Sequence, residues 1–235
     1  MPGSPPAPDP NEAVACARRL ADGLDPRLRY HDARHTFAEV VPAVRALAHA
    51  AGVGPDVRDL LVVAAAFHDL GFLALPDGAR AHDLAPVRGT DGCGHERVGA
   101  ALMRRTLAPL GYGDAALDRI ERTILATRLG HRPTTLEERL LSDADLALLG
   151  SRAFPIRNED LRLERAALGV APVRRAVWAR TQADFLLRHR FASEVAERAY
   201  GPERARNERL LRSYARTGRR PVAGRTSLSG GAERD

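Results

Sequence analysis

The stretch LVVAAAFHDLG, residues 61–71, joins seven consecutive apolar residues directly to His68 and Asp69. An apolar run of this length is typical of a buried helix, and Gly71 stands where a C′ glycine would end it, so His68 and Asp69 are expected in its last turn. Burying an imidazole and a carboxylate is costly unless another group pairs with them, and a bound cation is one common solution. The stretch therefore prompts a search for further metal ligands.

A second candidate group lies upstream, in the segment YHDARHT at residues 30–36. This segment opens a helical pattern, with apolar residues at three- and four-residue spacing as far as about Ala51, and Pro42 inside it should kink the helix. His31 and His35 would lie one turn apart in such a helix. We therefore expect the two imidazoles on the same face.

A third candidate group lies downstream, in LLSDADL at residues 140–146, an apolar run that closes at Gly150. It contains two carboxylates, Asp143 and Asp145. Because residues two apart do not share a helix face, only one of the two can point into a common site.

In chain order the candidates are His35, the pair His68 and Asp69, and an aspartate of the third group. This order resembles the HD superfamily of metal-dependent phosphohydrolases, and YHDARHT resembles the YHN-x-x-H signature of its phosphodiesterase-like members. The likeness covers about residues 30–150 and is weaker in the helices that follow. It implies that His35, His68, Asp69 and Asp145 bind the metal.

The resemblance also implies roles for the residues beside these ligands. His31 falls on the position of the proton donor in the phosphodiesterase-like members, although a histidine at the start of a helix is commonly just exposed. Asp32 replaces the usual Asn, and a carboxylate close to His31 would favour its protonated form. Asp69 is expected to orient the attacking water as well as to bind metal. Asp143 is expected to support the ligands from behind or to face solvent.

Three further residues are candidate substrate contacts. His95 and Glu96 begin a helix after a long loop and could hold phosphate or support the ligands, although a glutamate at a helix N-terminus is also ordinary dipole chemistry. Arg128 and His131 follow Ala126 and Thr127, and this neighbourhood resembles the Ala-Thr-then-His segment of the same family. His49 follows His35 by fourteen residues, about 21 Å along the helix axis, and is too far away to share the ion. His82 and His189 are interpreted as surface residues.

Two imidazoles and two carboxylates form an N/O site that suits one divalent transition-metal ion, namely Mn²⁺, Fe²⁺, Co²⁺, Ni²⁺ or Zn²⁺. A second ion would need histidines soon after His68 and Asp69, and the sequence continues instead with Leu70, Gly71 and Phe72. The sequence therefore favours a single ion.

The composition predicts an all-α protein, because Ala, Leu and Arg dominate and aromatic residues are 5% of the 235-residue chain, while 44% hydrophobic content is ample for a core. No apolar stretch approaches 18 residues, and residues 1–10 resemble no signal peptide. We expect a soluble, cytoplasmic protein with no membrane contact. Its oligomeric state is open.

The net charge of +6 arises from arginine alone, since the chain contains no lysine. Many arginines stand beside Glu or Asp, as in a solvated helix face, so a dedicated nucleic-acid surface is not favoured. Arginine near a pocket equally suits a phosphate-bearing small molecule.

The chain is expected to be one HD-like helical bundle with additional C-terminal helices. We predict a disordered leader at 1–10, an HD-type domain at 11–216 and a disordered tail at 217–235. Within the domain, the metal-binding core spans about 30–150 and the buttressing helices about 157–215. The Pro- and Gly-rich segment 76–94 is interpreted as a flap over the site.

Helices are expected from Asn11, as N-cap, to about Leu24, and then over 94–108, 114–128 and 135–149. Helical spacing also appears over 174–200 and 203–214. The expected core contacts of this C-terminal part are Val177, Phe185, Leu186 and Val195.

The leading hypothesis is a phosphohydrolase that uses a metal-activated water to hydrolyse a nucleotide or another small phosphate mono- or diester. The alternative is a non-catalytic helical regulatory module with a structural metal, whose Arg-rich surface binds nucleic acid or an acidic partner. Strong salt-dependent binding without turnover would distinguish the alternative.

Overall fold

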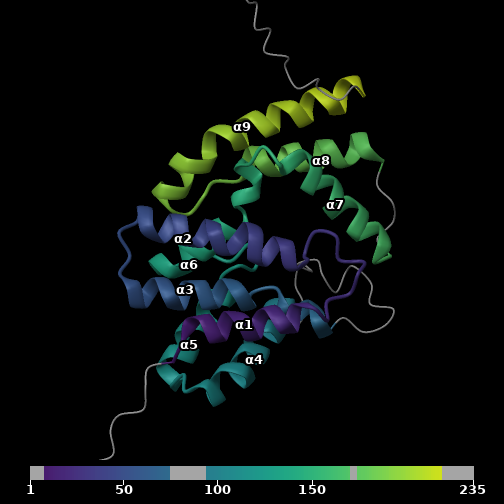
Figure 1. Ribbon diagram of the computed structural model, residues 1–235. Helices are drawn as coiled ribbons and strands as arrows, with labels where there is room; N and C mark the ends of the chain where they lie inside the picture. Colours follow the sequence, from purple (N-terminus) through teal and green to yellow (C-terminus); the bar gives the residue numbers. More distant parts are fainter. Residues whose placement is uncertain (1–7, 75–93, 170–173, 219–235) are drawn as a thin grey trace, which may run out of the picture.

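The computed structural model describes residues 8–74, 94–169 and 174–218, and its regular secondary structure in these ranges is helical, as predicted (Figure 1). The α-helices are α1 (Pro10–Ala21), α2 (Val41–Ala50), α3 (Pro55–Phe67), α4 (His95–Leu107), α5 (Asp114–Leu125), α6 (Leu136–Asp145), α7 (Phe154–Ala167), α8 (Arg175–Arg188) and α9 (Glu194–Thr217). None of them is both long and apolar enough to span a lipid bilayer. Apart from Gly94, the predicted flap lies outside the described residues, as do 1–7 and 219–235 of the predicted leader and tail.

Helix α1 begins two residues earlier than expected because Asp9, not Asn11, is its N-cap. The Asp9 carboxylate accepts a hydrogen bond from the Asn11 backbone N–H at 2.8 Å. The inward face of α1 carries Ala13, Ala17 and Ala21, which are buried against α3. Such small side chains allow the two helices to approach closely.

The helix that carries His35 is irregular. Residues His35–Val40 form a π-helix, and the Val41 N–H bonds to the Thr36 carbonyl five residues earlier. Pro42 lacks an N–H, and in a regular helix its ring would press against the carbonyl of residue 38. The irregularity expected at Pro42 is therefore present as a wider helical turn just before it.

His31 lies outside this helix, contrary to expectation. The Asp32 carboxylate accepts the backbone N–H of His35 at 2.9 Å, so Asp32 acts as the cap and His31 stands in the bend before it. The sequence suggested an uninterrupted turn from His31 to His35 because the capping role of Asp32 was not recognised.

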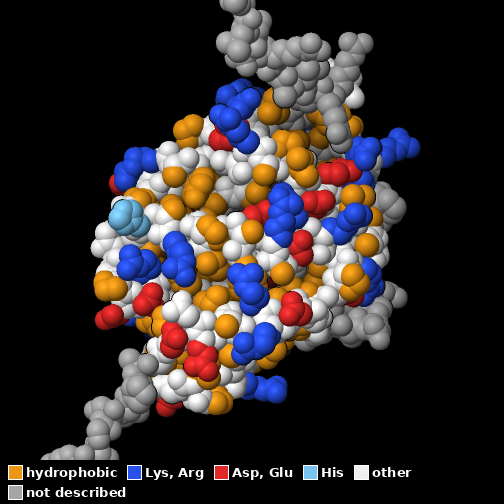
Figure 2. Space-filling view, in the orientation of Figure 1, with side chains coloured by type: hydrophobic (Ala, Val, Ile, Leu, Met, Phe, Trp, Pro, Cys, Tyr) orange, Lys and Arg blue, Asp and Glu red, His pale blue; other side chains and the backbone are white. Residues whose placement is uncertain are grey.

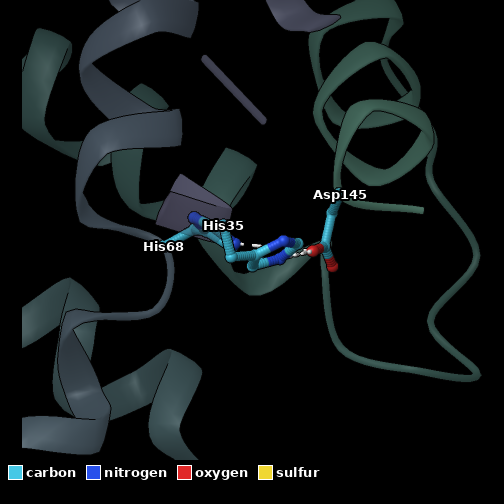
Figure 3. A group of neighbouring side chains, drawn as sticks. All are labelled: His35, His68 and Asp145. Atoms are coloured by element: carbon cyan, nitrogen blue, oxygen red, sulfur yellow. Dashed lines mark hydrogen bonds and ion pairs between the residues drawn. The ribbon is translucent and has the colours of Figure 1, made fainter. Parts of the chain in front are cut away.

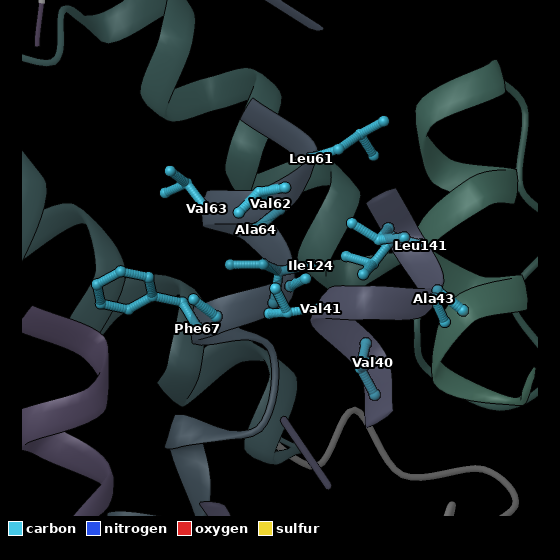
Figure 4. Packing of buried hydrophobic residues seen from close by; sticks show 14 of the residues in the cluster. Val40, Val41, Ala43, Leu61, Val62, Val63, Ala64, Phe67, Ile124 and Leu141 are labelled. Carbon is cyan, nitrogen blue, oxygen red and sulfur yellow. The ribbon is translucent and has the colours of Figure 1, made fainter. Parts of the chain in front are cut away.

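The apolar run Leu61–Phe67 is fully buried, and α3 is the central helix (Figure 4). Residues from α2, α5 and α6, such as Val41, Ile124 and Leu141, pack with it in one hydrophobic core. The chain leaves α3 after Phe67 and enters a short 3₁₀ helix at Leu70–Ala74.

Gly71 does not act as a C′ glycine, because its φ is not positive. A Cβ at this position would overlap the His95 carbonyl oxygen and lie 2.8 Å from the Gly99 backbone nitrogen. Gly71 therefore permits the close approach of the 3₁₀ helix to α4, and this contact brings the beginning of α4 to the end of α3.

The three predicted helices between residues 94 and 149 are present as α4, α5 and α6, with a 3₁₀ turn at Ala147–Gly150 completing the last one. Helix α6 starts with a capping box. The Thr135 hydroxyl accepts the Glu138 N–H, and the Glu138 carboxylate binds the Thr135 N–H. These bonds fix where α6 begins, and its ten residues then place Asp145 at its last position.

Helices α7–α9 form a second group that packs on the side of α2 and α6 (Figure 1). α8 and α9 lie against each other, and α9 also contacts the turn after α6, where the Asn207 side chain donates to the carbonyls of Leu149 and Ser151 at 2.9 and 2.8 Å. The C-terminal helices are thus attached to the end of the element that carries Asp145.

Three expectations about the C-terminal part are wrong. The pattern over 174–200 is broken between α8 and α9, where Ser193 caps α9 and accepts from the Ala196 N–H. Val177 is 51% exposed, because the neighbouring Trp178 occupies the inward position. The His189 ring is not solvated but packs between Phe185 and Phe191, at centroid distances of 5.8 and 4.8 Å.

Arginine and acidic side chains are interspersed on the surface drawn in Figure 2. Several arginines form ion pairs with acidic neighbours: Arg104 with Glu121, Arg119 with Glu137, Arg175 with Glu159, Arg206 with Glu203 and Arg212 with Glu208. Pairs of this exposed kind contribute little to stability, about 0–1 kcal/mol each, but they neutralise much of the arginine charge locally.

Candidate metal centre

Three elements converge on one buried cluster. The π-helix supplies His35, the end of α3 supplies His68, and the end of α6 supplies Asp145 (Figure 3). One ligand atom from each of these residues lies within 4.8 Å of the others. Asp145 Oδ1 is 3.1 Å from His35 Nε2 and 3.4 Å from His68 Nε2. The three side chains could therefore hold a metal ion.

Asp69, the fourth predicted ligand, borders the same cluster. Its Oδ2 lies 3.1 Å from His68 Nε2 and 3.6 Å from His35 Nε2. Both Asp69 Oδ2 and His68 Nε2 are buried without a well-aligned hydrogen bond. Unsatisfied buried polar atoms are costly and uncommon, so two of them facing each other beside further N/O ligands fit a bound cation. The role of the four residues as ligands remains a prediction.

The second nitrogen of each imidazole has its own partner. His68 Nδ1 lies 2.8 Å from the Ala65 carbonyl oxygen, and His35 Nδ1 lies 3.2 Å from Glu39 Oε2. An Nδ1–H that donates to an oxygen leaves the Nε2 lone pair of the neutral ring available for a metal. Both rings are thus arranged to offer Nε2 to the cluster.

When no cation is bound, the buried histidines and carboxylates of the cluster strongly shift one another's pKa values. Burial opposes a charge on His35, but the carboxylates of Asp145 and Glu39 outweigh it and raise the pKa of the imidazole to about 9. Burial likewise opposes charge on His68, and Asp69 with Asp145 raises its pKa well above the usual value. Against the effect of burial, His68 and His95 hold the pKa of Asp69 well below its usual range, and His35 and His68 lower the pKa of Asp145. A bound divalent cation would replace the protons on the imidazoles.

His31 lies at the edge of the centre, with its ring 6.0 Å from that of His35 and 4.6 Å from that of Phe72. Its Nδ1 is 2.5 Å from Glu164 Oε1, and Glu164 Oε2 accepts the backbone N–H groups of Tyr30 and His31 at 2.7 and 3.0 Å. The carboxylate that pairs with the His31 ring is therefore Glu164 of α7, and not Asp32 as expected.

Glu164 was missed in the sequence because it stands on the inward face of α7, which also carries Arg157. Charged residues at these positions disrupt the apolar periodicity that would have revealed the helix. A signal was nevertheless present: Arg157 and Glu164 are seven residues apart, two helical turns, and so they lie on one face.

His95 reaches the centre from α4. Its Nε2 lies 3.4 Å from Asp69 Oδ1, and its ring stacks on Phe72 at 4.1 Å. Burial disfavours a charge on His95, yet Asp69 raises its pKa above the usual value. Glu96 follows with Oε1 3.7 Å from the same His95 nitrogen. The pair is thus beside the predicted ligands, and its contact with a substrate remains a prediction.

Arg128 and His131 are not brought to the cluster. Both are exposed, and His131 Nε2 lies 3.9 Å from Glu138 at the beginning of α6. Asp145 stands at the other end of this ten-residue helix, about 10 Å away along the axis. Their placement does not support the predicted substrate contacts.

Asp143 has a different role from the one expected. It is buried, and its carboxylate accepts hydrogen bonds from the backbone N–H of Ala192 at 2.6 Å and from the N–H and hydroxyl of Ser193 at 2.8 and 2.5 Å. Asp143 therefore ties α6 to the start of α9 and neither supports the metal ligands nor faces solvent. His49, which was not expected to reach the ion, is exposed.

A cavity of about 500 Å³ opens beside His35 and Asp145. Of the four predicted ligands, Asp145 has the most exposed side chain, at 20%. Most of the cavity wall consists of small apolar side chains from α2 and the end of α6, together with Tyr200 of α9, and Arg34 and Glu39 supply charges. The cavity thus borders the cluster on the side of Asp145.

The family model of the HD domain matches residues 38–147, a range that contains His68, Asp69 and Asp145 and begins three residues after His35. No curated protein and no solved structure matches the chain. The family match and the His/Asp cluster together support an HD-domain superfamily protein. The HD domain is characteristic of a superfamily of metal-dependent phosphohydrolases, and residues 38–147 are similar to it.

Proposed function

We propose that this protein hydrolyses a small phosphate mono- or diester with the help of one divalent transition-metal ion. The observation that carries the proposal is the pair of buried atoms His68 Nε2 and Asp69 Oδ2, which lack a well-aligned hydrogen bond and lie next to the Nε2 of His35 and the carboxylate of Asp145. In an HD domain, this set of two imidazoles and two carboxylates matches the preference of Mn²⁺, Fe²⁺, Co²⁺, Ni²⁺ or Zn²⁺.

A bound ion of this kind would lower the pKa of a water molecule and neutralise negative charge on the phosphate. His35, His68, Asp69 and Asp145 would hold it. Asp69 has a second carboxylate oxygen, Oδ1, which faces His95 and not the other ligands. This oxygen is suited to orient the attacking water by accepting a hydrogen bond from it.

His31 is suited to supply the proton that the leaving oxygen requires. Glu164 binds Nδ1 of this ring, and it also fixes the backbone at residues 30 and 31. The other nitrogen, Nε2, is therefore the one that can donate to a substrate. A positioned general acid of this kind contributes about 10²- to 10⁴-fold to the rate.

The cavity beside His35 and Asp145 supports a substrate of small size. Its volume of about 500 Å³ lies within the range of about 300–1,000 Å³ that is usual for small-molecule sites. Its apolar wall suits the organic part of a phosphate ester, while Arg34 at the wall can pair with a phosphate oxygen. A nucleotide is one class of ester that meets these requirements.

The test is a hydrolysis screen of the purified protein with each of the five metals. The substrates should include nucleoside mono-, di- and triphosphates, cyclic nucleotides and aryl phosphate mono- and diesters. We expect metal-dependent release of phosphate or of the alcohol from at least one of them, and none from Asp145→Ala. No hydrolysis with any metal would contradict the proposal.

The competing function, a regulatory module that binds nucleic acid or an acidic partner, is less well supported. Several surface arginines already pair with acidic neighbours, so they would have to exchange these pairs for phosphate contacts. Tight nucleic-acid binding that weakens steeply with salt, in a protein without turnover, would favour this function.

A further inference from the structure

Arg157 is the largest side chain of the fully buried group, with a residue exposure of 1%, and it belongs to α7, outside the range matched by the HD domain. Burying a guanidinium costs several kcal/mol unless its donors are satisfied. The structure surrounds Arg157 with acceptors from the segment before the π-helix and from the π-helix itself. A positively charged side chain buried this close to a predicted metal site needs a structural explanation.

The contacts of Arg157 converge on His35. Its Nη2 lies 3.3 Å from Asp32 Oδ1, the same oxygen that caps the His35 backbone N–H at 2.9 Å. Its Nε lies 3.0 Å from Glu39 Oε1, and its Nη2 lies 3.4 Å from Glu39 Oε2. Glu39 Oε2 is also the partner of His35 Nδ1, at 3.2 Å.

The same guanidinium fixes the chain leading into the site. Nη1 donates to the Arg29 carbonyl and Nη2 to the Tyr30 carbonyl, each at 2.7 Å. Arg157 therefore controls the backbone before His35, the cap at its N–H, and the carboxylate behind its ring.

We propose that Arg157 is a positioning residue for the metal centre: it holds Glu39 so that this carboxylate binds His35 Nδ1 and keeps His35 Nε2 directed at the metal. The inference rests on the proposed metal-binding function and deepens it. A carboxylate one turn from a metal ligand can also swing toward the cation. The ion pair with Arg157, whose Nε and Nη2 lie 3.0 and 3.4 Å from the two carboxylate oxygens, restrains Glu39 from doing so.

The metal centre would then extend beyond the residues that match the HD domain. The HD match ends at residue 147, but the side chain that fixes one of its ligands comes from residue 157. α7 is therefore part of the metal centre and not merely a support for the bundle. Its removal would be expected to loosen His35 while leaving His68, which its own helix holds, in place.

The experiment compares Arg157→Met with Arg204→Met in the full-length protein. Arg204 is a matched control because it is also a buried arginine, at 6% exposure, but it lies in α9 and contacts the Leu186 carbonyl and Glu197. The affinity for Mn²⁺ alone is measured from the electron paramagnetic resonance signal of the free ion. Partners of metal-ligating histidines typically change affinity by about 10- to 100-fold. We expect a loss of this size for Arg157→Met and less than about 3-fold for Arg204→Met.

A second variant, Glu39→Gln, tests the connection between the two side chains, and it remains informative if Arg157→Met fails to fold. If Arg157 acts through Glu39, the double variant should be little worse than the worse single variant, because the two losses share one mechanism. Fully additive losses, or equal losses in Arg157→Met and Arg204→Met, would overturn the inference. Arg157→Lys keeps the charge but not the planar fork and should recover the affinity only in part.

A measurement on the metal-free protein distinguishes this inference from the proposed function. In the metal-free protein, the hydrogen-bonded Nδ1 proton of His35 should exchange slowly with solvent and be visible in a nitrogen-correlated NMR spectrum of the histidine rings. The signal should persist in Arg204→Met and be lost in Glu39→Ala and Arg157→Met. If the wild type bound none of the five metals, the proposed function would fail. A persistent signal in Arg157→Met would refute the positioning role alone.

Discussion

His35 and His68 offer the same atom, Nε2, to the same centre, but they are held in different ways. His68 directly follows α3, and its Nδ1 contacts the carbonyl of Ala65 three residues earlier, so the helix that carries the ring also fixes it. The His35 ring depends instead on Glu39 and, through it, on Arg157 of a helix more than a hundred residues away.

The difference shows that the predicted ligands of one candidate metal centre can have separate structural supports. His68 is fixed by a main-chain carbonyl that no single substitution removes. His35 is fixed by side chains, and its support is therefore sensitive to point mutations in parts of the chain that never touch the metal. His31 belongs with His35 in this respect, because Glu164 of α7 holds its ring.

The largest effect is expected at Asp145, whose carboxylate lies close to both imidazoles. Asp145 Oδ1 lies close to both Nε2 atoms, so Asp145→Ala should disturb both rings equally and reduce the metal content measured by elemental analysis to a small fraction. Asp143→Ala is the control. It should retain the metal but lower the free energy of unfolding by about 1–3 kcal/mol, since it leaves buried donors of residues 192 and 193 without their acceptor. Metal loss in Asp143→Ala with retention in Asp145→Ala would show that the ligand is the wrong carboxylate of the pair.

The next largest effect is expected at His31, which, like His35, is held by a side chain of α7. His31→Ala should lower kcat by about 10²- to 10⁴-fold with the metal content unchanged, because a proton donor is lost and no ligand is. Glu164→Gln should lower kcat by about 10-fold through a misplaced ring. Asp32→Asn should have a smaller effect than Glu164→Gln, because Asp32 contacts the helix N-terminus and not the His31 ring. If His31→Ala kept full activity on a substrate with a poor leaving group, the proton would have to come from another residue.

The pH dependence of Mn²⁺ affinity tests how the His35 ring is supported. In the metal-free protein the pKa of His35 is raised to about 9, so below this pH a proton must leave before Nε2 can bind an ion. Mn²⁺ affinity should therefore rise between about pH 6.5 and 9, by about tenfold per pH unit for each proton displaced, and calorimetry in two buffers should detect the protons released. Glu39→Gln should flatten the rise, since Glu39 is one of the groups that raise the pKa of His35. An affinity independent of pH in this range would contradict protonation of the ligands.

The smallest effect is expected in the C-terminal helices, far from either ring. Burial, reinforced by the charge of Arg204, lowers the pKa of His189 to about 4. The unfolded chain takes up a proton near pH 6.5 that the folded protein does not accept until about pH 4. Stability is therefore complete above pH 6.5 and falls between pH 6.5 and 4, by about 1–2 kcal/mol once solvent screening is allowed for. His189→Phe should remove this part of the pH dependence in thermal unfolding, whereas His49→Gln, at an exposed position, should not.

Much of the HD bundle is predictable from the chain because its signals are local. The apolar run Leu61–Phe67 defines α3, and glycine and proline clusters mark the ends of the next helices. The proximity of His35, His68, Asp69 and Asp145 followed from the resemblance to HD enzymes. Composition and spacing alone left the choice between Asp143 and Asp145 open.

The parts that escaped prediction depend on distant partners. α7 did not stand out, because Arg157 and Glu164 occupy the inward positions where apolar residues would have revealed the helix. The break before α9 has neither proline nor glycine, and Asp143 from α6 stabilises it. His131 was placed at the site because its segment resembles the Ala-Thr-then-His segment of HD enzymes, although it stands at the end of α6 that is remote from Asp145.

The π-helix at His35–Val40 has a consequence for the length of the chain. A π-turn holds one residue more than an α-turn, so the segment behaves like a helix with a single-residue insertion. Removing one residue from positions 36–40 would restore an ordinary helix and leave Val41, Val44 and Leu47 in the core. Everything before the deletion would rotate by about 100° around the axis, and the His35 ring would turn away from His68. In this region the spacing between residues would matter to the centre as much as their identity, and a one-residue deletion would be as damaging as the loss of a ligand.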